Sequence, residues 1–269
     1  MALDSNFVRQ CVSLGANYED KSRLAFFALI AALHERFQNP WWRKFTSVTP
    51  NLWIKPKQLD GARLLINPVD WSQTVIFEEV FIRNSYDLSK VPFVPQVILD
   101  CGAHIGIFSL LAGCKFPKAR LIAYEPNPQN VEFIRRQIAG NDLEITLIES
   151  AVSIEENVLD FELGNSHSGR LFHGVPGNSA CKVPVINFPE AVRALQPASL
   201  LLKMDVEGEE TRIFPKLMPF LPKQSAIFFE THSGNAGWRE IENLLTSDEF
   251  KVEQINSRGM FCDGFAYRK

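Results

Sequence analysis

The sequence predicts an α/β fold: a doubly wound, mainly parallel sheet with an antiparallel C-terminal hairpin and an N-terminal helical and β cap. Two observations support this prediction. From residue 97 onward, short apolar strand patterns alternate with helical patterns, and repeated units of this kind build parallel sheets. The last two strand patterns, 251–255 and 261–267, flank Ser257-Arg258-Gly259 and therefore predict a hairpin.

Size and composition are those of a folded enzyme. The 269 residues suit one large domain or a domain with a cap, and 46% of them are hydrophobic and 22% charged. A net charge of −3 argues against a nucleic-acid partner. Five scattered cysteines without a CxxC pair indicate free thiols in a reducing compartment. The longest apolar run, 24–33, is far shorter than the roughly twenty residues of a membrane span. We therefore expect a cytoplasmic protein without a transmembrane segment.

The N-terminal part is expected to form the cap, with its boundary near residue 90. Its patterns predict helices over 6–15 and 22–38, strands at 52–55 and 63–66 around the turn signal Asp60-Gly61, and a short helix at 77–83. We expect Trp41-Trp42 to pack as a lid over the sheet, with an interfacial membrane anchor as the alternative.

Residues 91–269 are expected to form the main domain. Its patterns predict strands at 97–99, 120–124, 144–148, 200–204 and 226–229, and helices at 105–116, 128–139, 188–195, 209–217 and 235–247. The glycine-rich stretch 164–181 is expected to be a mobile loop or a hairpin insertion. Ligands of such sheets bind beyond the carboxyl ends of the strands, so these ends indicate where a site lies.

The first of these strands runs into Asp100-Cys101-Gly102-Ala103-His104-Ile105-Gly106. Glycines allow a tight turn that brings backbone N–H groups against a ligand. The dinucleotide pattern GxGxxG fails here, because His104 and Ile107 stand where the second and third glycines belong. Asp100 would repel a phosphate and suits a ligand with an ammonium group instead.

The second strand ends at Glu125-Pro126-Asn127. A carboxylate about twenty residues after a glycine loop is placed to accept hydrogen bonds from both ribose hydroxyls. Together with the loop, Glu125 points to a nucleoside that carries a positive charge and no pyrophosphate. S-adenosylmethionine matches that description.

These motifs resemble the FkbM family of S-adenosylmethionine-dependent methyltransferases. The resemblance rests on the loop Asp100 to Gly106, Tyr124-Glu125-Pro126-Asn127-Pro128, Ser150-Ala151-Val152, and Lys203-Met204-Asp205-Val206-Glu207-Gly208-Glu209, in this order. It implies a class I, Rossmann-like methyltransferase domain with a seven-stranded sheet that includes one antiparallel strand. It also implies methylation of oxygen in natural products, sugars or lipids.

The resemblance further implies a set of cofactor-binding residues. The methionine part would lie on Asp100, Gly102, His104 and Gly106, the ribose on Glu125 with Asn127 beside it, and the adenine along Ser150-Ala151. His104 stands where the family usually has asparagine, which leaves its side-chain contact open. Glu79 and Tyr86 occupy positions where the family has similar residues, and we expect Glu79 to reach the cofactor.

Acidic residues follow the fourth strand of the main domain. Asp205, Glu207, Glu209 and Glu210 crowd four carboxylates into six positions, and a solvated helix start is the alternative reading of Glu209 and Glu210. The next strand ends at Glu230-Thr231-His232. We expect Asp205, Glu207, Glu230 and His232 to converge at one mouth from adjacent strands.

Methyl transfer to an alcohol requires a base, since the hydroxyl proton must leave. We predict Asp205, His232 and Glu230 as the catalytic residues, with His232 or Asp205 as the base and a packed or capping role as the alternative for His232. The same cluster is able to bind Mg²⁺ or Mn²⁺, but we do not expect a metal. His167 and His173 are expected to be solvated.

The sequence thus predicts an S-adenosylmethionine-dependent methyltransferase that acts on a hydroxyl of a small molecule. Three alternatives remain open: an N-methyltransferase, a metal-assisted O-methyltransferase, and a scaffold that binds the cofactor without catalysis.

Overall fold

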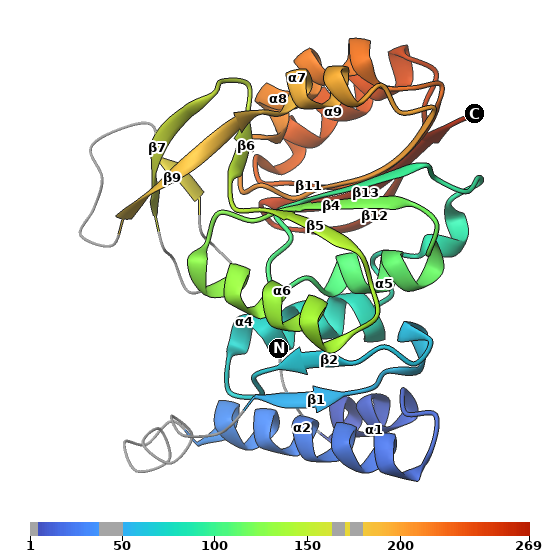
Figure 1. The fold of residues 1–269 in the computed structure, drawn as a ribbon, viewed down its shortest axis with the longest axis vertical. Helices are drawn as coiled ribbons and strands as arrows, with labels where there is room; N and C mark the ends of the chain where they lie inside the picture. Colours follow the sequence, from blue (N-terminus) through green and yellow to red (C-terminus); the bar gives the residue numbers. More distant parts are fainter. Residues whose placement is uncertain (1–4, 38–50, 163–169, 173–179) are drawn as a thin grey trace.

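A computed structural model describes residues 5–37, 51–162, 170–172 and 180–269. Its centre is a seven-stranded sheet with the strand order β12-β13-β11-β10-β3-β4-β5 (Figure 1). The parallel strands are β3 (Val97–Cys101), β4 (Arg120–Tyr124), β5 (Ile145–Ile148), β10 (Ser199–Met204) and β11 (Gln224–Thr231). The antiparallel hairpin consists of β12 (Lys251–Arg258) and β13 (Phe261–Arg268). The predicted fold class, including this hairpin, is confirmed.

Helices cover both faces of the sheet, as the alternating patterns predict (Figure 1). On one face lie α5 (Ile107–Lys115) and α6 (Pro128–Gly140), and on the other α7 (Phe188–Leu195), α8 (Glu210–Leu217) with its extension η4 (Met218–Phe220), and α9 (Gly234–Ser247). Each face has its own apolar core. Phe214 and Trp238 belong to one core, and Phe108 and Ile134 to the other.

The strand register brings four carboxyl ends to one edge of the sheet. Cys101 is level with Tyr124 on one side and with Met204 on the other, and Met204 is level with Phe229. From β3 the chain proceeds outward to β4 and β5, then crosses back to β10 on the other side of β3. The switch point of the sheet therefore lies between β3 and β10, where ligands of such folds bind.

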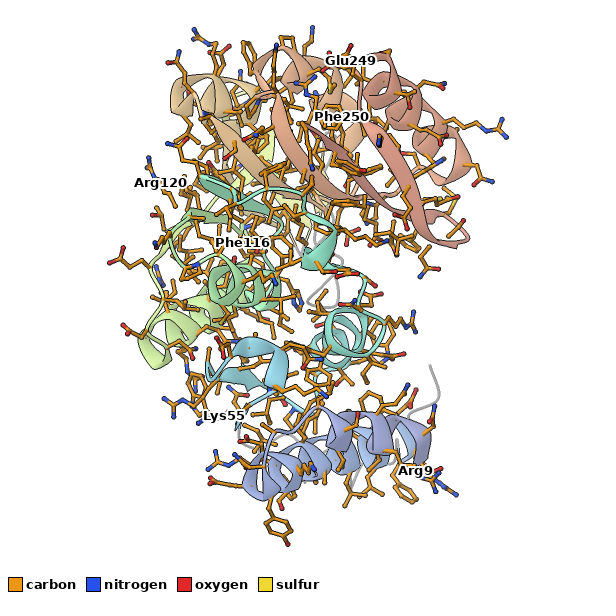
Figure 2. All side chains as sticks on the ribbon, turned by 90° about the vertical axis from the view of Figure 1, so that its right-hand side faces the viewer. Arg9, Lys55, Phe116, Arg120, Glu249 and Phe250 are labelled. Carbon is orange, nitrogen blue, oxygen red and sulfur yellow. The ribbon has the colours of Figure 1, made fainter. Side chains whose placement is uncertain are left out.

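The cap begins with two helices, α1 (Ser5–Ser13) and α2 (Tyr18–Arg36), which form a layer at one end of the molecule (Figures 1 and 2). They pack against the antiparallel pair β1 (Leu52–Ile54) and β2 (Leu64–Ile66). The predicted pairing is correct, but the connection is not a tight hairpin. It contains the 3₁₀ helix η1 (Lys57–Leu59) before the left-handed turn at Asp60 and Gly61.

The segment after β2 contains more helix than the sequence predicts. It consists of α4 (Trp71–Phe77), the π-helix η2 (Glu78–Ile82) and the 3₁₀ helix η3 (Leu88–Lys90). α4 begins at residue 71 because Asp70 caps it, accepting hydrogen bonds from the backbone N–H groups of Ser72 and Gln73. π-helical turns are frequent at functional sites, and η2 carries Glu79 to the mouth of the sheet.

The cap and the main domain share a core. Ile107 and Leu110 of α5 lie in the same buried cluster as Phe27 of α2 and Ile54 of β1. The amide of Gln137 on α6 acts as a clamp, accepting from the backbone N–H of Leu65 and donating to its carbonyl. The cap is therefore packed firmly on the main domain, and the predicted division near residue 90 stays a prediction.

A second sheet lies beyond the carboxyl end of β5 and was not predicted (Figure 1). Its strands are β6 (Ala151–Ser153), β7 (Asn157–Glu162), β8 (Arg170–Phe172) and β9 (Ala180–Asn187), in the order β6-β9-β7-β8. Phe161 and Val185 form part of its small apolar core. The described parts of 164–181 are thus strands, which favours the predicted insertion over a simple loop.

Three sequence predictions fall outside the described residues: the Trp41-Trp42 lid, and the solvated His167 and His173. Within the described parts of the chain, no helix has both the length and the hydropathy required to cross a membrane.

Candidate active site

A cavity of about 280 Å³ opens at the carboxyl ends of β3, β4, β10 and β11. The cap contributes α4 and η2 to its wall, the main domain contributes the loops after these four strands, and the second sheet closes one side. The polar or charged side chains of its lining include Ser72, Glu79, His104, Glu125, Asn127, Asn130, Asp205, Glu207, Glu230 and His232. The predicted residues Gly102, Ser150 and Ala151 line it as well.

The glycine loop after β3 is held in a conformation that requires Gly102. Its φ angle is +74°, and a Cβ atom there would lie 1.9 Å from the carbonyl oxygen of Asp205. Because only glycine tolerates both constraints, β3 and β10 approach closely at the cavity floor. Gly106, with φ +84°, lies at the start of α5 and does not line the cavity; its Cα faces Ile134. Gly106 thus has a packing role at the start of α5, and its contact with a cofactor stays a prediction.

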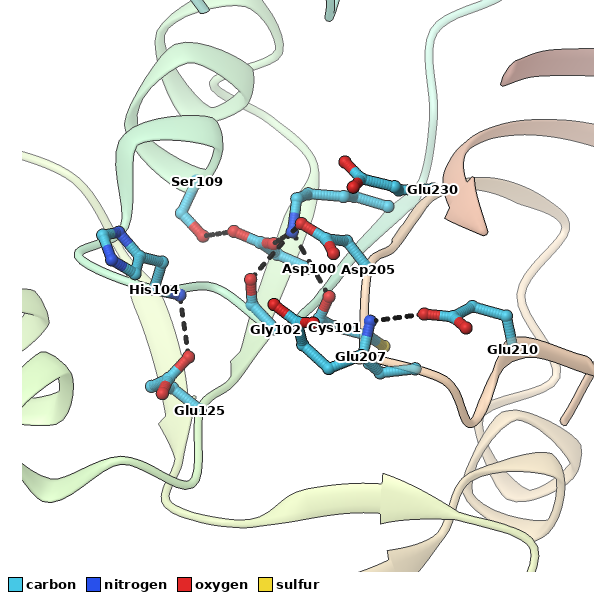
Figure 3. A network of polar contacts seen from close by, with 12 residues as sticks. Asp100, Cys101, Gly102, His104, Ser109, Glu125, Asp205, Glu207, Glu210 and Glu230 are labelled. Carbon is cyan, nitrogen blue, oxygen red and sulfur yellow. Dashed lines mark hydrogen bonds and ion pairs between the residues drawn. The ribbon is translucent and has the colours of Figure 1, made fainter. Parts of the chain in front are cut away.

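Asp100 supports the glycine loop from its buried side, through Lys203 (Figure 3). Its side chain is completely buried, accepts a hydrogen bond of 2.6 Å from the Ser109 hydroxyl, and lies 3.7 Å from Nζ of Lys203. That ammonium group donates to the carbonyl of Gly102 at 2.8 Å. Asp100 does not line the cavity. Asp100 therefore positions Lys203 and the loop, and its direct contact with a cofactor ammonium stays a prediction.

Glu125 joins the loop to the end of β4. Its carboxylate accepts hydrogen bonds from the backbone N–H groups of His104 at 2.8 Å and Asn127 at 2.9 Å, and from the Asn130 amide at 3.2 Å. Burial raises the pKa of Glu125 to about 7, although these hydrogen bonds oppose the change. The Asn127 side chain caps α6. Glu125 therefore sits at the cavity, preorganised and at the position predicted for a ribose-binding carboxylate.

The border of the cavity after β5 is formed by the small residues Ser150 and Ala151 and by Val152. The Ser150 hydroxyl lies 2.7 Å from the carbonyl oxygen of Ala151 and 3.1 Å from that of Pro184. Because this hydroxyl is engaged with the second sheet, Ser150 and Ala151 present main chain and small groups to a ligand. A flat aromatic ring fits such a wall.

Four predicted residues converge on the opposite side of the cavity. Nε2 of His232 lies 3.2 Å from Glu207, 3.5 Å from Glu230 and 3.8 Å from Asp205. Asp205 is also 3.4 Å from Nζ of Lys203. The structure thus brings these side chains together from the ends of β10 and β11, as the sequence predicts.

Glu210 completes this cluster and was missed from the sequence. Its side chain is buried, and its Oε1 lies 3.1 Å from Nδ1 of His232 and accepts a hydrogen bond from the backbone N–H of Val206. Its Oε2 accepts from Gly208. Glu209 is buried too, against Arg212 and Ser153. The alternative of a solvated helix start is therefore wrong for both glutamates.

The ionisable groups around His232 differ in how strongly they hold a proton. Burial alone would lower the pKa of His232, but the hydrogen bond to Glu210 and the neighbouring carboxylates raise it to about 10. Burial, with Asp205 and Asp263 nearby, raises the pKa of Glu230 to about 9. Burial also raises the pKa of Asp205, but Lys203 and His232 outweigh it and hold that pKa low. At neutral pH the cluster is thus a protonated imidazole and an ammonium group among carboxyl groups, of which Glu230 holds its proton most strongly.

Comparison with known proteins identifies the family. The model of the methyltransferase FkbM domain matches residues 100–252, more than half of the chain. The chain belongs to the FkbM methyltransferase family. The matched segment begins at Asp100 and includes the glycine loop, Glu125 and the acidic cluster described above.

The relatives of this chain are distant. The methyltransferase sdnD of Sordaria araneosa is 32% identical over 122 residues, which are 44% of this chain and 44% of that protein. Methyltransferase 1 of Beauveria bassiana is 33% identical over 63 residues, 23% of this chain and 25% of that protein. The chain thus spans less than half of the length of these relatives. A crystal structure of methyltransferase FkbM from Methylobacillus flagellatus has a TM-score of 0.50 and 11% identity, covering 97% of this chain and 57% of that one. It supports the shared fold.

The FkbM cavity suits S-adenosylmethionine better than a dinucleotide. Glu125 is available to ribose hydroxyls, and the backbone of Gly102 is exposed to the cavity without a side chain. Among the described lining residues there is no lysine or arginine to neutralise a pyrophosphate.

The cluster of Asp205, Glu210 and His232 is a poor site for a resident metal ion. Asp205, Glu210 and His232 place potential ligand atoms within 4.8 Å of one another. However, both oxygens of Glu210 accept backbone hydrogen bonds, and Nδ1 of His232 faces Glu210 itself. The ammonium group of Lys203 also lies beside Asp205. These partners already supply the positive charge that a cation would bring, so we derive no step through a metal.

Proposed function

We propose that this FkbM-family protein is an S-adenosylmethionine-dependent methyltransferase that methylates a hydroxyl group of a small molecule. The observation that carries the proposal is that one cavity contains both Glu125 with the glycine loop and the cluster around His232. The first half suits a charged nucleoside, and the second suits a reaction that releases a proton. Their proximity is what a transfer between two bound molecules requires.

In this proposal the chain binds the cofactor through the loop and two strand ends. Gly102 and His104 would contact the methionine part, Glu125 and Asn127 the ribose, and Ser150 with Ala151 the adenine. Glu79 faces the same cavity from the cap and would lie near the acceptor or the methionine part. When bound, S-adenosylmethionine supplies an activated methyl group on a sulfonium.

The acidic cluster serves the acceptor. A hydroxyl loses its proton as the new O–C bond forms, and a nearby base lowers the barrier by accepting it. Asp205, Glu230 and His232 all line the cavity and are the candidates for this role. Apolar side chains of the wall, among them Val75, Ile76 and Phe261, would pack against the carbon skeleton of the acceptor.

The experiment that tests the proposal is incubation of the protein with methyl-labelled S-adenosylmethionine and fractions of a host extract. Mass spectrometry and NMR of the labelled products then identify the methylated atom. We expect labelled methoxy groups on small molecules. Labelled N-methyl groups would favour the N-methyltransferase alternative, and cofactor binding without any labelled product would favour the scaffold alternative.

A further inference from the structure

The geometry around His232 distinguishes among the three candidate bases, if the proposed methyl transfer is correct. His232 itself is poorly suited to accept a proton. Its Nδ1 lies 3.1 Å from Glu210 and its Nε2 lies 3.2 Å from Glu207, so a carboxylate faces each ring nitrogen. Such a ring is stabilised as the imidazolium, with both nitrogens donating hydrogen bonds. It has no free lone pair for the acceptor's proton.

Asp205 is a weak base because a cation faces each of its two oxygens. One of its oxygens lies 3.4 Å from Nζ of Lys203, and the other lies 3.8 Å from Nε2 of His232. Two cations stabilise the ionised carboxylate and reduce its affinity for a proton. Asp205 is therefore suited to hold Lys203 and His232 in place.

Glu230 has the strongest reason to take a proton. It follows Phe229 at the end of β11 and lines the main cavity on one side. On its other side it borders a small void of about 10 Å³ together with Glu79, Tyr86, Lys203, Asp205 and Asp263.

Most of the groups that face Glu230 are acidic. Asp205 faces it from the end of β10, Asp263 from β13, where it is paired with Glu230 in register, and Glu79 from η2. Its cationic contact is with His232, at 3.5 Å, and that ring is shared with Glu207, Glu210 and Asp205. An ionised Glu230 in these surroundings lacks a partner of its own, and the neutral carboxylic acid is the stable form of the resting protein.

We propose that Glu230 takes the acceptor's proton, and that the positive charge of the bound methyl donor prepares it by displacing the proton that Glu230 carries in the free protein. In the transfer, the S–CH₃ bond breaks with its electron pair remaining on sulfur, an O–CH₃ bond forms, and the hydroxyl proton passes to the Glu230 carboxylate. The sulfonium and carboxylate become a neutral thioether and a neutral carboxylic acid. The net charge of the buried site is therefore the same before and after the reaction.

The size of the effect follows from the charges. A positive charge within about 4–6 Å lowers the pKa of a carboxyl group by about 1–3. Applied to a starting value of about 9, a decrease of about 2 changes the protonated fraction of Glu230 at pH 8 from roughly 0.9 to roughly 0.1. Binding of S-adenosylmethionine should then release about 0.8 of a proton from Glu230. S-adenosylhomocysteine, whose sulfur is uncharged, should release almost none.

Isothermal titration calorimetry tests this without an acceptor. The binding enthalpy of each ligand is measured at pH 8 in buffers of different ionisation enthalpy, and the slope gives the number of protons released. The α-amino group of the ligand also titrates near this pH. The readout is therefore the difference between the wild type and Glu230→Gln, in which the contribution of the ligand cancels. Glu253→Gln, an exposed glutamate paired with Lys90 on the far edge of the sheet, is the matched control.

We expect the wild type and Glu253→Gln to release about 0.8 of a proton more than Glu230→Gln with S-adenosylmethionine, and the three proteins to agree with S-adenosylhomocysteine. Equal proton release by wild type and Glu230→Gln, or equal release with both ligands, would overturn the proposal. If Glu230→Gln fails to fold by circular dichroism, Glu230→Asp replaces it and should still show the difference between the two ligands. If the wild type binds neither S-adenosylmethionine nor S-adenosylhomocysteine, the proposed function itself is contradicted.

Discussion

Glu210→Gln should lower the pKa of His232 while leaving the protein folded. Glutamine with its carbonyl oxygen in place of Oε1 keeps an acceptor for the backbone N–H groups of Val206 and Gly208. It loses the second hydrogen bond from Gly208 to Oε2 and the negative charge that faces Nδ1 of His232. A charge-assisted hydrogen bond of a buried group is worth about 1.5–3 kcal/mol, and 1.36 kcal/mol corresponds to one pKa unit. From a value of about 10, the pKa of His232 should therefore fall to about 8–9.

NMR titration of the imidazole Cε1–H signal measures this pKa. The chain has five histidines, and comparison with His232→Asn assigns the signal. Glu209→Gln is the matched control, because Glu209 is the buried neighbour on the same turn and contacts Arg212 and Ser153 rather than His232. An unchanged pKa of His232 in Glu210→Gln, or an equal decrease in Glu209→Gln, would refute the assignment of Glu210 as the residue that positions His232.

The same structure makes four further predictions. Glu125→Ala should lose about 1.5–3 kcal/mol of affinity for S-adenosylmethionine by calorimetry, the value of a hydrogen bond to a charged group, and NAD should bind the wild type more weakly than S-adenosylmethionine does. Equal affinities of Glu125→Ala and the wild type for S-adenosylmethionine would remove Glu125 from the site. Gly102→Ala should lower the melting temperature and abolish cofactor binding because its Cβ would lie 1.9 Å from a carbonyl oxygen. Gly113→Ala, whose Cβ would meet the Leu143 side chain at 3.5 Å, should bind the cofactor normally. EDTA should leave methyl transfer unchanged, since Lys203 and His232 already supply the positive charge of the cluster; loss of activity with recovery on adding Mg²⁺ would restore the metal-assisted alternative. The free energy of unfolding should decrease as pH rises through about 10, because the pKa of His232 is about 10 in the folded protein and near 6.5 in the unfolded chain. The stabilisation by protonated His232 is complete below pH 6.5 and is lost above the folded value. Chemical denaturation should show this loss in the wild type and not in His232→Asn.

The main sheet was predictable because its strands are short apolar runs between glycine, proline and charged residues. The strand at 120–124 and the helix at 188–195 have the predicted bounds. The second sheet was not predicted, since β6 and β8 are only three residues long and glycine-rich segments separate β7, β8 and β9. The early start of α4 follows from Asp70 before Trp71, a capping pattern at the N-terminus of the helix.

Most site residues were predictable because they follow buried strands, whose carboxyl ends meet at one edge. The exceptions depend on side-chain direction and on backbone conformation. Asp100 lies inside β3 and points toward Ser109 and Lys203, a direction that the motif alone does not specify. Glu210 reaches His232 because Glu207 and Gly208 have φ angles of +56° and +112°. That left-handed turn reverses the chain, and no periodic pattern predicts it.

The most direct test of the account is a crystal structure of the protein with S-adenosylhomocysteine. We predict that the ribose hydroxyls contact Glu125, that the adenine lies along Ser150 and Ala151, and that the sulfur faces the cluster of Asp205 and Glu230. A ligand bound with its ribose away from Glu125, or with its sulfur outside the cavity that contains the acidic cluster, would contradict the central claim that one cavity joins donor and base.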